Sequence, residues 1–154
     1  MNIIESIMVT EDITLISLQD CPNDIAFLSQ LFEIISNADI NVDMISQTPA
    51  KGGLIDISFT VSSEQLAEVL SCMSTLRGIH KTLKIDILSG CCKISIFGEA
   101  MRSNSGVATR VFNVAKEQNI NITLITTSEV DISLLIENAN CENFVKALKT
   151  AFNN

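Results

Sequence analysis

The sequence contains an internal repeat, and this feature most restricts how the chain can fold. Three pairs of segments align: 26–35 with 106–115, 39–45 with 119–125, and 56–61 with 131–136. Apolar residues occupy matching positions almost throughout, and both copies carry an Ile-Asn and an Asp-Ile-Ser. Chance similarity between two α/β segments does not explain these matches, so we infer two homologous modules.

Each module alternates between helix-like and strand-like periodicity. Residues 24–38 carry apolar pairs at helical spacing, with Asn23 or Asp24 as the N-cap, and the stretch after Ser105 repeats the pattern. Strands are expected at period-two or β-rich runs bounded by turn residues. These runs are 14–18, 40–46, 55–61, 83–88, 93–97, 120–126 and 130–136.

A second helix is expected in each module. In the first module, Ser62 and Gln65 have the spacing of a capping box, and Gly78 is placed to end the helix. In the second module, apolar residues at helical spacing predict a helix from about 140 to 151.

The resulting order, strand-helix-strand-strand-helix-strand, is the split β-α-β motif of ferredoxin-like folds. We therefore expect an α+β protein of two tandem modules, 1–89 and 90–154, each an antiparallel sheet with helices on one face. The second module ends without a closing strand, whereas 3–9 forms an extra strand before the first. Since a module without its edge strand is underpacked, we predict that 3–9 crosses over to complete one of the two sheets.

Composition narrows the class of protein. Of the 154 residues 47% are apolar and 18% charged, which is too apolar for a disordered chain, and no apolar run is long enough to span a membrane. The net charge of −8, with no Trp, no Tyr and no basic cluster, argues against binding nucleic acid or anionic lipid. The N-terminus lacks the pattern of a secretion signal, and five cysteines without a C-x-x-C pair suit reduced thiols in a cytoplasmic protein.

The sequence offers no recognisable catalytic or metal site. His80 is the single histidine and cannot complete a metal cluster with these cysteines, and no phosphate-binding P-loop is present. Glu129 and Asp131 could imitate an acid–base pair, but we expect them on a solvated strand edge. We therefore predict no catalytic residues and no metal in this chain, and a binding function instead.

Two helix N-termini, near 23–27 and 105–107, could hold a carboxylate through their amide groups. Strict alternation along 40–47 would turn Asn41, Asp43, Ile45 and Gln47 away from the helices. Asp43 could then accept an ammonium group, although it could equally be only solvated. Its counterpart in the repeat is the uncharged Thr123, which favours a single amino-acid site per chain.

Residues 38–47, 55–61, 101–108 and 125–133 resemble the tandem ACT domains of the aspartokinase regulatory region. The resemblance implies that the chain senses lysine, threonine or both. It also implies a homodimer and a separate aspartokinase catalytic domain or subunit, which would carry ATP and Mg and is absent here. The chain would be a regulatory subunit or a C-terminal fragment. Alternatives are a free-standing amino-acid sensor and a dimerisation module without a ligand.

The same resemblance implies an effector site between the first module of one chain and the second module of its partner. By position, the first-module side consists of Asn23, Asp24, Ile25, Ala26, Phe27, Leu28, Asn41, Val42, Asp43 and Gln47. The second-module side consists of Ala108, Thr109, Ile122, Thr123 and Ser128. The family's Asp-Lys-Pro-Gly is here Asn23-Asp24-Ile25-Ala26, and alanine in place of glycine is expected to crowd a ligand. The sequence therefore leaves the identity of the effector open.

Overall fold

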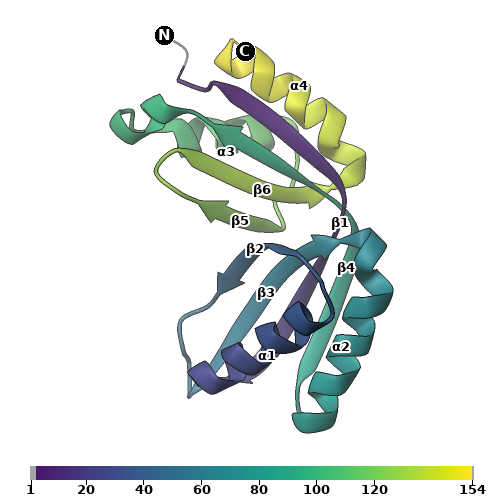
Figure 1. The fold of residues 1–154 in the computed structure, drawn as a ribbon. Coiled ribbons are helices and arrows are strands. Elements are labelled where there is room, and N and C mark those ends of the chain that lie inside the picture. Colours follow the sequence, from purple (N-terminus) through teal and green to yellow (C-terminus); the bar gives the residue numbers. More distant parts are fainter. Residues whose placement is uncertain (1–2, 154) are drawn as a thin grey trace. The chain divides into compact units, whose positions relative to one another are not determined.

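The computed structural model describes residues 3–153, which form two compact units (Figure 1). One unit is Asp12–Ser89, and the other combines the residues up to Glu11 with those from Gly90 onward. Two long strands, β1 (Ser6–Pro22) and β4 (Lys84–Phe97), contribute one segment to each unit. The α+β class and the duplicated ferredoxin-like order expected from the sequence are confirmed.

In the unit Asp12–Ser89 the strand order is β2-β3-β1-β4, with β2 at Val42–Gln47 and β3 at Leu54–Ser62. Helices α1 (Ile25–Asn37) and α2 (Leu66–Ile79) pack on one face of this sheet. The core joins apolar residues from both helices and from β1 and β3, among them Leu31, Leu76, Leu18, Ile57 and Phe59.

In the other unit the order is β1-β4-β6-β5, with β5 at Leu124–Thr127 and β6 at Asp131–Glu137. Helices α3 (Val107–Glu117) and α4 (Cys141–Phe152) share its core. The N-terminal segment completes this unit: Ile4 is fully buried in the core, and the Glu5 amide donates to the carbonyl of Phe97 at 2.8 Å. The extra strand thus lies in the sheet of the second repeat.

Gly98 lets the N-terminal segment pass close to the end of β4. A Cβ at this position would overlap the carbonyl oxygen of Ile3, which is a backbone atom and cannot move aside. Glycine is therefore required here by the close approach of two backbones.

Equivalent contacts occur inside each of the two repeats. A serine hydroxyl pair joins the first and third strands of each, Ser17 with Ser58 at 3.2 Å and Ser95 with Ser133 at 3.1 Å. The turn after the first helix of each repeat has a left-handed residue, Asp39 in one and Asn119 in the other. The internal repeat is therefore present in the backbone as well as in the sequence.

Several local expectations are wrong. The short strands expected at 3–9 and 14–18 are one strand, β1, and those at 83–88 and 93–97 are one strand, β4. The left-handed residues Asp12 and Gly90 bend these strands without ending them. In the sequence, Asp12 and Gly90 suggested a boundary between two strands, because Asp and Gly usually mark turns.

The prediction of a capping box is also wrong. Ser62 does accept a hydrogen bond from the Glu64 amide at 3.4 Å, but Gln65 instead bridges the Asp39 carbonyl and the Asn41 amide. The helix α2 continues past Gly78 to Ile79. Tertiary hydrogen bonding has replaced the local contact that the spacing of the two residues suggested.

All five cysteines are free and buried, and the chemistry of their thiols follows from this burial. Burial, with the nearby carboxylates of Asp56 and Asp20, raises the pKa of the Cys21 thiol to about 11. Burial also raises the pKa of Cys92, whose thiol is hydrogen-bonded to that of Cys141.

No helix between residues 3 and 153 is long and apolar enough to cross a membrane.

Ile4→Ala should destabilise the protein by about 3 kcal/mol, because it leaves a cavity in a core that Ile4 fills completely. Met8→Ala is the matched control, since Met8 lies four residues further along the same N-terminal segment but is 60% exposed. Urea unfolding of both variants measures the difference. Equal stability of the two variants would show that the N-terminal segment does not belong to the core.

Raising the pH from about 8 to about 11 should lower the free energy of unfolding by about 2 kcal/mol through Cys21 alone. The Cys21 thiol of the unfolded chain ionises near its ordinary pKa, whereas the folded one stays neutral until about pH 11. Its contribution to the free energy of unfolding is therefore fully present below the unfolded pKa and is lost as the pH rises through the folded pKa. Cys21→Ala should lose less stability over the same range. The same loss in Cys21→Ala as in the parent protein would exclude Cys21 as the cause.

Candidate functional site

A pocket of about 240 Å³ lies at the N-terminus of α3, within the second unit. Its walls come from the segment before α3, the first turn of α3, the end of β5 and the start of β6. They are formed by Met101, Asn104, Gly106, Val107, Ala108, Thr127, Ser128, Glu129 and Ile132. A pocket below the ~300–1,000 Å³ of typical drug-sized sites suits a ligand as small as a single amino acid.

The start of α3 is suited to an anion. Gly106, at φ +87°, is its N-cap and has no side chain that could accept a hydrogen bond from the first turn. The first amide groups of a helix have no partner inside the helix and carry partial positive charge. Since no capping side chain occupies them here, the amides beside the pocket are available to a carboxylate.

Glu129 brings a negative charge to the pocket. Its carboxylate is 76% exposed and lies 3.2 Å from the guanidinium of Arg102, which also lies 3.6 Å from Glu99. Surface ion pairs of this kind contribute little free energy, so a cationic group on a ligand could replace Arg102 at low cost. The pocket therefore offers donors for a carboxylate and an acceptor for an ammonium group.

Ser128 holds the turn between β5 and β6. Its hydroxyl oxygen accepts hydrogen bonds from the amides of Val130 and Asp131, at 3.2 and 3.1 Å. Thr48 does the same in the first repeat, accepting from the Asp56 amide at 2.9 Å. The hydroxyl hydrogen of Ser128 can still be donated, so the residue could orient the turn and also contact a ligand.

The equivalent helix start in the first unit is closed by its own side chain. Asp24 caps α1, and its carboxylate accepts from the Ala26 amide at 2.9 Å. The amides of Phe27 and Leu28 bond to the Asp24 carbonyl. The negative charge of Asp24 occupies the position where a ligand carboxylate would bind, so this helix start is poorly suited to an anion.

The expected alternation along 40–47 is wrong beyond Val42. Val42 pairs with Val61, but Ile45 pairs with Phe59, so one extra residue is inserted and a β-bulge forms at Asp43 and Met44. Directly opposite residues share a face, so Ile45 and Gln47 lie on the side of the sheet that carries the helices.

The second repeat contains the same bulge. Leu124 pairs with Leu135, and the amide of Thr123 also donates to the Leu135 carbonyl, at 2.8 Å. Two residues therefore oppose one, as at Asp43 and Met44. Asp43 and Thr123 occupy equivalent bulge positions, where a strand edge often redirects a side chain toward a binding site.

The remaining residues expected at the site are divided between surface and core. Asn23, Asp24, Ile25, Ala26, Asn41, Asp43, Gln47, Thr109, Thr123 and Ser128 are exposed. Phe27 is buried, and Leu28, Val42, Ala108 and Ile122 pack partly against the two cores. Of all the expected residues, the pocket at α3 brings Ala108 and Ser128 together.

Seven of the nine pocket residues are outside the effector set that the resemblance implies, although the helix start at 105–107 was expected to suit a carboxylate. They are Met101, Asn104, Gly106, Val107, Thr127, Glu129 and Ile132. Thr127 could have been inferred as the counterpart of Gln47, and Gly106 from its place before the helix. Glu129 was expected on a solvated strand edge and not at a binding site, because an isolated surface acid is ordinarily solvated. Within residues 3–153 no cluster of His, Cys, Asp and Glu could hold a metal ion.

Comparison with known proteins adds three findings. A family model described as an ACT domain matches residues 22–75 and 94–152. Aspartokinase from Geobacillus stearothermophilus is 31% identical over 150 residues, which are 97% of this chain and 36% of that protein. The chain thus spans little more than a third of the length of the curated relatives it matches.

Two solved structures that this chain resembles match over almost their whole length. A crystal structure of aspartokinase alpha and beta subunits is 32% identical, with a TM-score of 0.87, covering 98% of this chain and 99% of that one. The regulatory subunit of aspartate kinase from Thermus flavus is 25% identical, with a TM-score of 0.86, covering 97% and 98%.

Asp24→Ala should destabilise the first unit by about 1 kcal/mol, because it removes the side chain that caps α1. Glu33→Ala, at an exposed position inside the same helix, should change stability by less than about 0.5 kcal/mol. Thermal and urea unfolding measure both. If Asp24→Ala were as stable as Glu33→Ala, the carboxylate of Asp24 would not be acting as a cap.

Proposed function

We propose that this chain, which belongs to the ACT domain family and has the two-module architecture of aspartokinase regulatory regions, binds lysine or threonine and thereby controls an aspartate kinase. The catalytic domain, with ATP and Mg²⁺, would lie outside these 154 residues, either in the same polypeptide or in a separate subunit. The chain itself would supply sensing and no catalytic group.

The observation that carries this proposal is the uncapped start of α3 beside a small pocket. Gly106 leaves the first amides of α3 without a side-chain partner, and Glu129 lines the same pocket. These two features are complementary to the carboxylate and ammonium groups of a free amino acid. The hydroxyl groups of Thr127 and Ser128 would then face the side chain of the bound amino acid.

A second copy of the chain would complete the site. Its first unit would contribute Asp43 at the β2 bulge and Gln47 on the helix-covered side of β2. The closed helix start at Asp24 supports a site in which the first unit supplies acidic and amide side chains and the second unit supplies the carboxylate-binding amides. This division of roles favours one kind of effector site, present twice in a dimer.

Binding at such a site would act by population shift. An effector that contacts two chains binds more tightly to the dimer arrangement that brings both halves together, and so it stabilises that arrangement. Coupling between the two states of 1–3 kcal/mol is typical of such regulation. The kinase domain would respond to the change in the dimer and not to the amino acid directly.

Isothermal titration calorimetry of the chain with lysine, threonine and methionine tests the proposal. At least one of them should bind, and Glu129→Gln should weaken binding by about tenfold, because the ammonium group loses its charged partner. Asp43→Ala should also abolish or weaken binding while the far-UV circular dichroism stays unchanged.

Glu117→Gln and Glu33→Gln are the matched controls, since each removes an exposed carboxylate from a helix of the same unit outside the candidate site. Both should bind as the parent chain does. Absence of binding to every amino acid tested, in a chain that is folded, would contradict the proposed function and favour a dimerisation module without a ligand.

A further inference from the structure

Residues 6–11 of β1 form an open edge of the second unit's sheet. Pairing between β3 and β1 begins only at Ile13, so this segment has β4 on one side and no strand among residues 3–153 on the other. Met8 is 60% and Val9 41% exposed. An edge strand with apolar side chains and unpaired backbone groups is a template for another strand.

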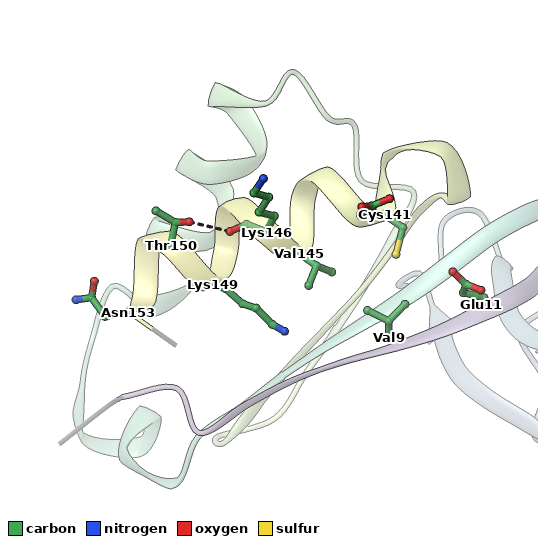
Figure 2. Close-up of a pocket in the computed structure, with 9 residues that line it drawn as sticks. Val9, Glu11, Cys141, Val145, Lys146, Lys149, Thr150 and Asn153 are labelled. Carbon is green, nitrogen blue, oxygen red and sulfur yellow. Dashed lines mark hydrogen bonds between the residues drawn. The ribbon is translucent and has the colours of Figure 1, made fainter.

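A groove runs beside this edge, between β1 and α4. It encloses about 930 Å³ and has Val9 and Glu11 on the strand side and Val145 and Lys149 on the helix side (Figure 2). Figure 2 shows Val145 and Lys149 pointing from α4 toward β1. The groove thus combines apolar residues in its middle with charged residues along its length.

Acidic and basic residues of the groove lie at opposite ends. Glu11 lies at the end of the groove where α4 begins. Its carboxylate is near enough to help raise the pKa of the Cys92 thiol, which is hydrogen-bonded to Cys141, the first residue of α4. Glu142 is in the first turn of α4, and Lys149 is in its last turn. No ion pair among residues 3–153 joins these three side chains to one another. One end of the groove is acidic and the other basic.

This polarity matches a second copy of the same surface. When two identical edges pair antiparallel about a two-fold axis, the acidic end of each meets the basic end of the other. Backbone groups of the two segments would then pair, Val9 would be covered, and Glu11 of each copy would face Lys149 of the other. A nucleic acid or an anionic membrane would instead require a surface of one sign.

We propose that the edge 6–11 and the adjoining groove form an isologous interface between two copies of this chain, joining their second units by antiparallel strand pairing. This interface is separate from the amino-acid pocket, because β1 and β5 are the opposite edges of the unit's strand order. A chain that used both surfaces would assemble beyond a dimer.

Charge reversal tests the pairing of Glu11 with Lys149. In sedimentation velocity over a range of protein concentrations, Glu11→Lys and Lys149→Glu should each weaken one association step by about tenfold, because each change places like charges opposite one another twice per interface. The double variant Glu11→Lys/Lys149→Glu should restore association to near that of the parent chain. Circular dichroism and melting temperature check that each variant is folded.

A crosslinking experiment locates the contact directly. Met8→Cys should give a covalent dimer under mild oxidation, since two exposed residues near the middle of the strand would lie close to the two-fold axis. Gln118→Cys, also at an exposed position but at the end of α3, should stay monomeric on a denaturing gel. Single reversals that associate like the parent chain, a double variant that is not rescued, or equal crosslinking at both positions would each overturn the proposal. None of these outcomes depends on amino-acid binding.

Discussion

The fold depends on the packing of an N-terminal strand into the core of the second repeat. Residues 90–153 supply three strands and two helices to the second repeat, and the N-terminal segment fills the remaining edge of its sheet and core. Ile4 is buried in this core, and Gly98 permits the backbone contact. Because β1 and β4 each contribute to both units, the second unit is assembled from two separate stretches of sequence, whereas the first unit is the continuous stretch Asp12–Ser89.

Because the two repeats have the same fold, the positions at which they differ are informative. Both have the same serine pair, the same left-handed residue after the first helix, and the same bulge in the edge strand. They differ where a ligand would be bound. The first helix start is capped by Asp24, whereas the second has Gly106 and open amides beside a pocket. Duplication has kept the architecture and changed the electrostatics of one of two equivalent positions.

The sequence predicted the architecture because the relevant signals are periodic and occur twice. Helical spacing at 27/28, 31/32 and 34/35 and its copy at 107/108 and 111/112 identified the two first helices. What it missed depends on single residues in tertiary context. The bulge at Asp43 and Met44 reverses the faces of Ile45 and Gln47, and no composition signal marks it. Gln65 donates a hydrogen bond to the Asp39 carbonyl and does not take part in a capping box. Glu129 is a candidate binding residue only because the turn between β5 and β6 places it at the pocket beside α3.

The proposed function requires that the amides at the start of α3 bind the carboxylate of a free amino acid. Two-dimensional ¹H–¹⁵N NMR of the chain, titrated with lysine or threonine, observes these amides directly. We expect saturable shifts at Val107 and Ala108 and little change at Ala26, whose amide already bonds to Asp24. Shifts confined to the first unit, or none at α3 when binding is complete, would contradict the proposed function.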